Sequence, residues 1–546
     1  MTGAATYWRT IRHLKAGQLV DRITFRLRRP SPDMRPAPMR RAPTGPWVLP
    51  AQRAASLAAP ATFELLEERH ALADIGWDDP ARTKLWRYNQ HYFDDLNAQD
   101  AAQRSDLHAA LIERWIEANA PGVGTGWEPY PVSLRVVNWI TWSLAGNDLS
   151  ATAITSLCVQ VRWLTQRLET HLLGNHLFAN AKALVFAGLL FEGAEAAAWL
   201  HTGASILERE LPEQILADGG QFELSPMYHA LALEDVLDLI DIIGAAGEHT
   251  AAVQKLRGLL AAQAPTMLAW LLALSHPDET LGRFNDCAEG IAPPTRELLR
   301  LAAALGFAAL TRADPGLVLL PQSGYVRVER GPVVALLDIA RVGPDYLPGH
   351  AHADTLSFEV SAAGRRVIVN GGTSCYGQGA QRQRERSTAA HSTVEVDSES
   401  SSEVWAGFRV GRRARPSAPM IERTGDALNV SGSHDGYAHR PGRPVHRRRW
   451  RFEDRSLIVS DDLGACRLPA VARFHLAPGL ELAPAGAACW AIDDGAVQIG
   501  RVEVVHGHGR VEASSYAPRF GLLCATRCLV VALDSGRATT TWTWGS

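Results

Sequence analysis

The chain has 546 residues, 46% of them hydrophobic and 21% charged, which is the composition of a globular protein with two or three domains. A formal net charge of −3 argues against a general nucleic-acid-binding protein, so any polyanionic partner has to meet local basic patches. The seven cysteines contain no Cys-x-x-Cys pair, so the sequence indicates neither a disulfide framework nor a thiolate zinc site.

Residues 1–60 are predicted to form a short basic amphipathic helix followed by an extended Pro-rich linker. The helix has two interpretations: an arm packed on the body, or a helix that binds a membrane surface or a partner. No signal-peptide core is visible, so we expect a cytoplasmic protein, with the periplasm as the alternative. No run of eighteen apolar residues occurs, so we expect no transmembrane segment.

Residues 61–315 repeat apolar side chains at helical spacing, from about residue 65 onward, with short Gly- or Pro-containing breaks. This pattern predicts stacked antiparallel helix pairs. Residues 316–546 change to a period of two with turn residues about every ten positions, which predicts an antiparallel β-sandwich. The fold class is therefore multidomain α and β, with helices first and strands second, and the cleft between the two domains is the expected ligand site.

Two segments of the helical region carry polar residues inside apolar helices. "HLLGNHLFANAKAL" contains Asn175, His176 and Asn180, which favour either a satisfied polar cluster or a site. "LSPMYH" places Ser225 and Pro226 at a predicted helix start, with Tyr228 in the first turn. A tyrosine there is either a proton donor or an aromatic wall.

A third helical segment, "GWEPYPVSLRVVNWITW", places Arg135 and Asn138 on one helix face next to Trp127. Aromatic rings of this kind stack on sugars, and they also fill helical cores. We carry Arg135, Asn138 and Trp127 forward as candidate substrate-binding residues, together with Arg386 from the arginine-rich part of the sandwich region.

The stretch "PGHAHADTLSFEV" places His350 and His352 just before a predicted strand. Asn370 ends the return strand at the same edge, and His391 begins a later strand, so these side chains are expected to converge. Imidazole and oxygen ligands suit Zn²⁺, and an acid–base role competes because histidine titrates near neutrality. Asp354 is expected to play a supporting hydrogen-bonding role.

Four segments together make the chain similar to the heparinase II/III-like polysaccharide lyases. They are "LWRYNQHYFDDL" (85–96), "GNHLFANAKAL" (174–184), "SPMYHALALEDVLDL" (225–239) and "PGHAHADTLSFEV…VIVNGGT…RSTAAHSTVEVD" (348–397). The resemblance implies an N-terminal incomplete (α/α) toroid and a C-terminal antiparallel β-sandwich. It also implies β-elimination at a uronic acid of an acidic polysaccharide, with a link to bacterial surface polysaccharide. The implied catalytic residues are Asn175, His176, Tyr228 and His350.

The resemblance further implies a structural zinc ion, because family members that bind one use His-x-His, a downstream Asp and a later His. The corresponding positions here are His352, Asn370 and His391. Asn370 departs from the pattern, and its neutral amide oxygen is a weaker ligand than a carboxylate.

Two other functions stay open from the residues alone. A glycoside hydrolase on the same scaffold would need a pair of carboxylates, for which Glu128, Glu223 and Asp354 are candidates. A non-catalytic glycan-binding or assembly protein would keep the groove without turnover.

Overall fold

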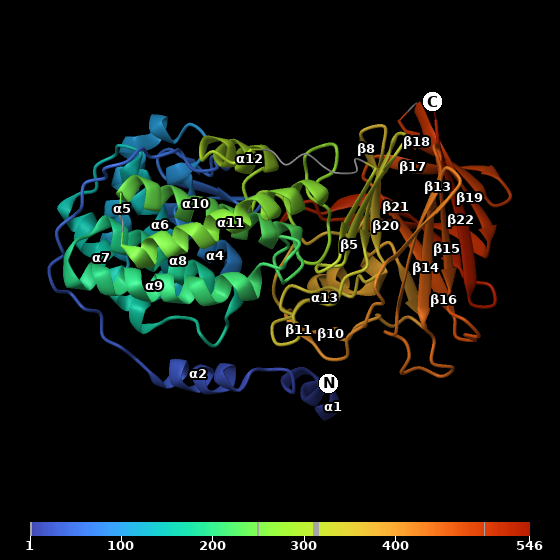
Figure 1. Ribbon diagram of the computed structural model, residues 1–546, viewed down its shortest axis with the longest axis horizontal. Helices are drawn as coiled ribbons and strands as arrows, with labels where there is room; N and C mark the ends of the chain where they lie inside the picture. Colours follow the sequence, from blue (N-terminus) through green and yellow to red (C-terminus); the bar gives the residue numbers. More distant parts are fainter. Residues whose placement is uncertain (1–2, 248–249, 309–315, 496, 546) are drawn as a thin grey trace.

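The structure is a computed structural model that describes residues 3–247, 250–308, 316–495 and 497–545 (Figure 1). Helices occupy one half of the molecule and two β-sheets the other half, in the predicted order. The predicted domain boundary at residue 315 falls at the end of the segment 309–315, outside the described residues.

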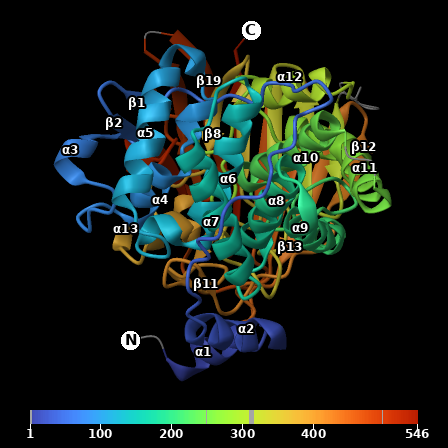
Figure 2. The ribbon, with the colours of Figure 1, turned by 90° about the vertical axis from the view of Figure 1, so that its left-hand side faces the viewer.

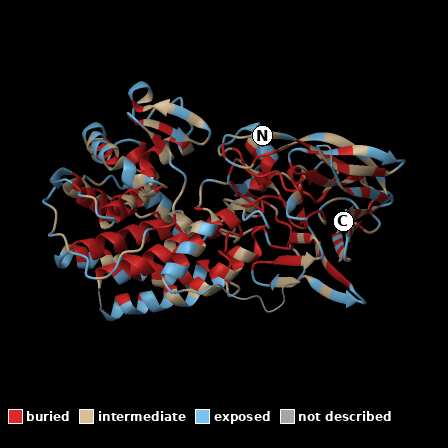
Figure 3. Cartoon of the chain, turned by 90° about the horizontal axis from the view of Figure 1, so that it is seen from above, coloured by how far each residue is buried: buried red, intermediate tan, exposed pale blue. Residues whose placement is uncertain are grey.

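The helical domain is an incomplete (α/α) toroid around one apolar core. Neighbouring helices pack in antiparallel pairs, and α8 contacts α6, α7, α9 and α10. Figure 3 shows buried residues along the inner helices and exposed residues on the outer faces. The helices are α3 (Leu72–Ile75), α4 (Lys84–Tyr92), α5 (Ser105–Ala118), α6 (Pro129–Leu144), α7 (Ala151–Gln166), α8 (Gly174–Leu190), α9 (Gly193–Gln214), α10 (Pro226–Ala246), α11 (Ala251–Ala273) and α12 (Thr295–Ala304).

Among the described residues, α11 is long and apolar enough to span a membrane by length and composition alone. It packs against α9, α10 and α12. Four of its leucines (Leu256, Leu260, Leu268 and Leu271) and Trp270 belong to the buried apolar clusters, which is the position of a core helix.

The sequence before α4 differs from the prediction in one respect. The helical pattern was expected from about residue 65, but a small antiparallel sheet stands there, formed by β1 (Leu57–Ala58), β2 (Thr62–Leu65) and β3 (Glu68–Ala71). Leu66 and Glu67 form the tight turn between β2 and β3, with positive φ values of 53° and 63°. Local turn geometry therefore overrides the helical spacing at this point.

The predicted linker is extended, and it lies against the helices. The Arg41 N–H donates to the Leu190 carbonyl at 2.7 Å, and the Arg53 guanidinium pairs with Glu234 at 2.7 Å. Before it, α1 (Ala4–Ile11) and α2 (Ala16–Leu27) form two helices instead of one, set apart from the body in Figures 1 and 2.

The sandwich consists of an eight-stranded sheet in the order β12-β13-β14-β15-β22-β19-β18-β17 and a nine-stranded sheet in the order β20-β21-β16-β8-β7-β6-β5-β4, with β9 on β16. All of the pairings are antiparallel, and the facing sides enclose one apolar cluster. The elements are β4 (Leu317–Leu320), β5 (Tyr325–Arg330), β6 (Val333–Asp338), β7 (Phe358–Ala362), β8 (Arg365–Val369), α13 (Ala380–Arg386), β9 (Val394–Val396), β10 (Val404–Trp405), β11 (Arg409–Val410), β12 (Met420–Thr424), β13 (Ala427–His434), β14 (His446–Phe452), β15 (Ser456–Asp462), β16 (Ala470–Leu476), β17 (Leu480–Gly486), β18 (Cys489–Asp494), β19 (Val497–His506), β20 (His508–Tyr516), β21 (Cys524–Ala532) and β22 (Arg537–Trp544).

The N-terminal ends of α8 and α10 face the sandwich. The Ser225 hydroxyl caps α10 by accepting the Tyr228 N–H at 3.3 Å, as the Ser-Pro pattern predicted. The chain enters α8 through Leu173 and Gly174, both with positive φ. A Cβ on Gly174 would lie 2.5 Å from Leu347 Cδ2 and 3.0 Å from Glu223 Oε1, so a larger residue would displace these side-chain ends, and the positive φ of 56° also favours glycine.

Candidate active site

The ends of several elements meet where the helical domain faces the sandwich. The helical domain contributes the first turns of α8 and α10 and the loop after α11, and the sandwich contributes the loops before β7 and after β8. These elements bring together Asn175, His176, Glu223, Tyr228, Asp286, His350 and Tyr376. The four residues proposed as catalytic from the sequence all belong to this cluster.

Tyr228 and His350 form one of the contacts between the two domains. Their rings stack with centroids 3.7 Å apart and planes at 27°. The Tyr228 hydroxyl lies 3.0 Å from the hydroxyl of Tyr376. Burial, reinforced by the neighbouring Tyr376 and by the Asp286 carboxylate, raises the pKa of Tyr228 well above its usual value. The phenol therefore keeps its proton at neutral pH.

The buried carboxylate of Asp286 orients His350. His350 Nδ1 lies 3.0 Å from Asp286 Oδ2, and the Asp286 N–H donates to the His350 carbonyl at 3.0 Å. Burial raises the pKa of Asp286, but the paired Arg382 guanidinium and the histidine hydrogen bonds outweigh burial and hold that pKa well below its usual range. An ionised Asp286 accepts a hydrogen bond from Nδ1–H, so the neutral tautomer of His350 that this contact favours carries its lone pair on Nε2, 3.7 Å from Glu223 Oε2.

Asn175 and His176 form the other wall of the cluster. His176 Nδ1 lies 3.1 Å from Glu169 Oε1, and its ring lies 4.5 Å from the ring of Tyr130. Burial lowers the pKa of His176, but the attraction of Glu169 outweighs burial, so the pKa is raised. Glu223 stands between the two walls, because it interacts with both His176 and His350 and accepts the Asn175 backbone N–H.

The positions of the imidazole protons decide whether His352 and His391 have nitrogen lone pairs free to bind a metal. His352 Nε2 lies 2.8 Å from the ionised Asp286 Oδ1, and His391 Nδ1 lies 2.8 Å from the Ser387 carbonyl oxygen. Both nitrogens must therefore be the N–H donors of neutral rings. The remaining nitrogens, His352 Nδ1 and His391 Nε2, face each other at 3.1 Å as two lone pairs. This is the arrangement of metal-ligating histidines whose outer nitrogens are held by a carboxylate and a carbonyl.

Asn370, the third candidate ligand, lies in the same buried region. Its Oδ1 accepts the Ser392 N–H at 2.9 Å, and its Nδ2 donates to Ser357 Oγ at 3.1 Å. A carbonyl oxygen retains a second lone pair, so the amide can still serve as a weak ligand. No group of three or more His, Cys, Asp or Glu side chains with metal-binding spacing exists among the described residues. The donor set fits a metal held mainly by two imidazoles.

The structure corrects the substrate-binding predictions for three buried residues. Arg135 is fully buried and donates to Gln160 at 2.8 Å and to the carbonyls of His91 and Gly126. Trp127 is buried in the helical core, and Arg386 is buried with its donors on backbone carbonyls such as that of Ala351. Side chains with no exposed surface and no free donor cannot contact a polymer, so their roles are structural.

The fourth of these residues, Asn138, is partly buried. Its amide donates to the Tyr92 carbonyl at 2.9 Å and to Asp94 Oδ1 at 2.8 Å. Asn180 is likewise a satisfied core residue, bonded to Ser133 and to Glu169. Asp354 has the supporting role that was expected, because its Oδ2 accepts the Asn285 N–H at 2.9 Å.

Four residues of the cluster had no predicted place in it, namely Glu169, Asp286, Tyr376 and Arg382, and Glu223 was considered only as a hydrolase carboxylate. The signal for Asp286 was weak: a polar "FND" following a glycine in a loop. Its partners lie 64 to 96 residues further along the chain, at His350, His352 and Arg382. Sequence periodicity and motif spacing give no information about contacts between residues that are so far apart in the chain.

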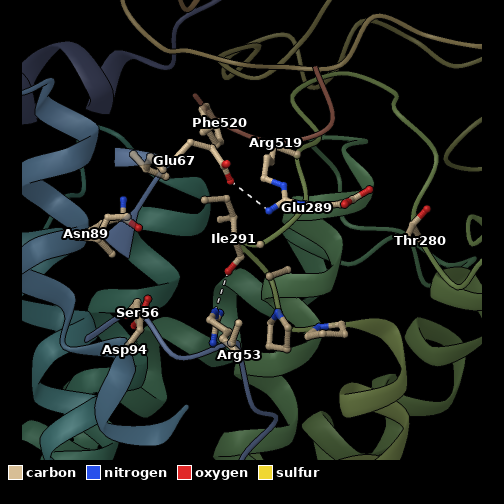
Figure 4. A pocket seen from close by; sticks show the side chains of 18 of the residues that line it. Arg53, Ser56, Glu67, Asn89, Asp94, Thr280, Glu289, Ile291, Arg519 and Phe520 are labelled. Carbon is tan, nitrogen blue, oxygen red and sulfur yellow. Dashed lines mark hydrogen bonds and ion pairs between the residues drawn. The ribbon is translucent and has the colours of Figure 1, made fainter. Parts of the chain in front are cut away.

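A cavity of about 890 Å³ lies beside the cluster, between the small N-terminal sheet and the loops at the domain interface (Figure 4). Its lining mixes both charges, including Arg53, Asp94, Glu289 and Arg519. Phe520 forms part of its wall and packs on Tyr376 at 4.8 Å. The predicted catalytic residues do not line this cavity, so we assign the site to the Tyr228–His350 cluster, where the reactive groups are.

The fold and the site define a two-domain protein, an incomplete (α/α) toroid joined to an antiparallel sandwich with a polar cluster between them. Two family models match the chain: "Heparinase II/III N-terminus" over residues 105–300 and "Heparinase II/III-like, C-terminal" over residues 312–545. The protein belongs to the heparinase II/III-like family.

Individual relatives agree with this assignment. The chain is 28% identical over 249 residues to a heparin-sulfate lyase of Bacteroides stercoris, covering 41% of this chain and 36% of that protein. It is 37% identical over 114 residues to a heparin-sulfate lyase of Pedobacter heparinus, covering 20% and 17%. The matches thus span about a third or less of the relatives' length. A crystal structure of heparinase III has the same fold, with a TM-score of 0.67 at 18% identity over 86% of this chain and 79% of that one.

Proposed function

We propose that this protein is a polysaccharide lyase that cleaves a uronic-acid-containing acidic polysaccharide by β-elimination. The observation that carries the proposal is the stack of Tyr228 on His350, whose Nδ1 lies beside Asp286, together with Glu223, which interacts with His350, His176 and the Asn175 backbone. The named relatives are heparin-sulfate lyases, so polymers of that type are the first substrates to test.

The first requirement of the reaction is to acidify the proton on C5 of the uronate. That proton is poorly acidic while the neighbouring carboxylate is charged, because removing it adds further negative charge. His176, with a pKa raised by Glu169, and the amide of Asn175 would bind the carboxylate and stabilise the enolate-like intermediate.

The second requirement is proton transfer at two atoms. In our proposal His350 Nε2 takes the C5 proton, while Asp286 holds the proton on Nδ1. The electron pair left on C5 forms the C4–C5 double bond, and the bond from C4 to the glycosidic oxygen breaks. Tyr228 donates its proton to that oxygen. A buried phenol with a raised pKa favours this acid role over a base role.

We further propose that His352 and His391 hold a structural metal ion, with zinc the best match to imidazole ligands. The metal would cross-link the loop before β7 to the segment before β9. It takes no part in the elimination steps above.

The test is turnover of a uronate panel, followed by the ultraviolet absorbance of the unsaturated product. Tyr228→Phe and His350→Ala are each expected to lower kcat by about 10²- to 10⁴-fold, since each removes a proton-transfer group. Tyr346→Phe is the matched control, because its hydroxyl bonds Glu213 near the surface. Mass spectrometry separates the mechanisms: hydrolysis adds water to the products and elimination does not. Absorbance that persists in both variants would refute the assigned roles.

A further inference from the structure

The N-terminal helices α1 and α2 stand apart from both domains. In Figures 1 and 2 they lie below the body, joined to it by the extended segment that follows α2. The sequence left open whether this region packs on the body or binds something else. The structure shows that each helix docks one face on the body and leaves another face exposed.

The docked faces use polar and aromatic contacts. On α1, the Thr6 hydroxyl and the Arg9 guanidinium both donate to Glu403 at 2.6 Å, and the Trp405 indole donates to Thr10 at 3.1 Å. On α2, Phe25 lies 4.3 Å from the His171 ring and stacks on the Arg167 guanidinium at 3.6 Å. These contacts fix how the helices are rotated about their axes.

The opposite faces are apolar and exposed to solvent. Leu19, Val20, Ile23 and Leu27 recur at helical spacing, and at about 100° per residue they lie across α2 from Phe25. Leu27 is 78% exposed, Val20 62% and Ile23 61%. Trp8 and Ile11 on α1 are also exposed. An amphipathic helix normally buries its apolar face, so an exposed one is a candidate surface for a partner outside the chain.

The net charge of residues 1–30 indicates which class of partner the exposed apolar face would bind. Residues 1–30 contain seven Lys or Arg and one Asp, a net charge of +6 in a chain whose total is −3. Arg22, Arg26 and Arg28 make no ion pair with the described residues, so their guanidinium groups are available. Basic side chains beside an exposed apolar face with an exposed tryptophan are what an interfacial membrane helix presents to anionic lipids.

We propose that α1 and α2 bind the protein to a membrane surface that carries anionic lipids. The apolar side chains enter the boundary between headgroups and acyl chains, and the arginines pair with lipid phosphates. A symmetric contact between two copies is disfavoured, because it would bring two regions of charge +6 together. A polyanionic glycan would satisfy the arginines and leave the apolar face in water.

The same contact places the cleft near the membrane. α1 docks on Glu403 and Trp405, which belong to the β10–β11 hairpin. Phe408, at the turn of that hairpin, lies with its ring centroid 6.2 Å from that of His350. A protein bound through α1 and α2 would therefore hold one edge of the candidate active site toward the lipid surface.

The test is flotation of the full chain with vesicles of phosphatidylcholine alone or with about one third phosphatidylglycerol added, at low and high salt. We expect binding only to the anionic vesicles, weakened by salt. Ile23→Asp/Leu27→Asp should weaken that binding by tenfold or more, since both side chains leave the lipid phase. Met420→Asp/Val505→Asp, on exposed apolar residues of the sandwich, is the matched control and should bind as wild type does.

A second variant separates charge from apolar contact. Arg22→Gln/Arg26→Gln/Arg28→Gln should lose about fivefold in affinity for each arginine and should lose its preference for anionic vesicles. Turnover of a soluble polymer should not change in either variant, so failure of this proposal is distinct from failure of the proposed lyase function. The proposal is overturned by absence of vesicle binding, by full binding of Ile23→Asp/Leu27→Asp, or by a dimer in solution that this variant abolishes.

Discussion

The sandwich contains two buried pairs of histidines that differ in where their protons lie. In the first pair, His352 and His391 donate outward to Asp286 and Ser387, so two lone pairs face each other at 3.1 Å. In the second pair, His434 accepts the Gly436 N–H on Nδ1 and so carries its proton on Nε2, 3.3 Å from His446 Nδ1.

The second pair is complete without any added ion. His446 Nε2 lies 2.7 Å from Asp461 Oδ1, and the Arg448 guanidinium pairs with the same carboxylate. Each nitrogen is either a donor with an acceptor or an acceptor with a donor. Burial lowers the pKa of the histidines in both pairs, to about 4 for His352, so a proton does not fill the gap in the first pair at neutral pH. Two adjacent imidazoles therefore indicate a metal only when their outer nitrogens both donate.

The largest expected effect follows from breaking the first pair. His352→Ala removes a proposed metal ligand and leaves the buried Asp286 carboxylate with one donor fewer, which should cost about 3–5 kcal/mol of unfolding free energy. Activity should fall as well, because Asp286 also holds His350. Urea unfolding and turnover on the active polymer measure the two losses. Wild-type stability in this variant would show that the His352–His391 pair neither binds a stabilising metal nor stabilises Asp286.

Metal removal distinguishes the two pairs directly. Chelator should lower the Tm of the wild-type protein and release about one zinc per chain, because a bound metal stabilises only the folded state. His391→Ala should unfold at the same temperature with and without chelator. A protein purified without metal whose Tm ignores both zinc and chelator would contradict the assignment.

Breaking the second pair should lower the free energy of unfolding by a smaller amount. His446→Phe leaves Arg448 on Asp461 but removes one hydrogen bond from that carboxylate and one from His434, for a loss of about 1–3 kcal/mol. The response to chelator and the turnover should both match those of the wild-type protein. A changed metal content in this variant would remove the distinction between the pairs.

A variant with higher expected metal affinity tests whether residue 370 contacts the metal proposed between His352 and His391. Asn370→Asp replaces the amide proposed as a weak ligand by a carboxylate, while Ser357 and the Ser392 N–H can still donate to it. Zinc should leave this variant about tenfold more slowly than it leaves the wild-type protein in excess chelator. Equal release rates would mean that residue 370 does not touch the metal.

The smallest expected effect concerns His176. This histidine lies beside the Glu169 carboxylate, as His352 and His446 lie beside carboxylates, but among the described residues it is not paired with another histidine. Glu169 raises the pKa of His176, so the imidazolium persists to higher pH and is lost as pH rises through that raised value. Glu169→Gln should therefore move the alkaline limb of the pH–rate profile to lower pH, by about one unit or less. A lower kcat with an unmoved limb would assign Glu169 a purely structural role.

Much of the fold could be predicted because it rests on local preferences. The change of apolar period from helical spacing to two placed the helices before the strands, and the Ser225–Pro226 pair located the start of α10. The small sheet of β1 to β3 was missed, since a two-residue turn with positive φ leaves little trace in an apolar pattern.

Of the candidate site, the sequence by itself supplied the residues proposed to carry the chemistry: Asn175, His176, Tyr228 and His350, on segments that resemble a known family. Tertiary structure alone decided how they act. It supplied Asp286 and Glu223 from distant loops, buried Arg135 and Arg386 away from any substrate, and turned the apolar face of α2 outward. The reason is physical: helix starts and strand alternation depend on neighbours a few residues away, whereas proton positions, burial and exposed faces depend on side chains that only folding brings together.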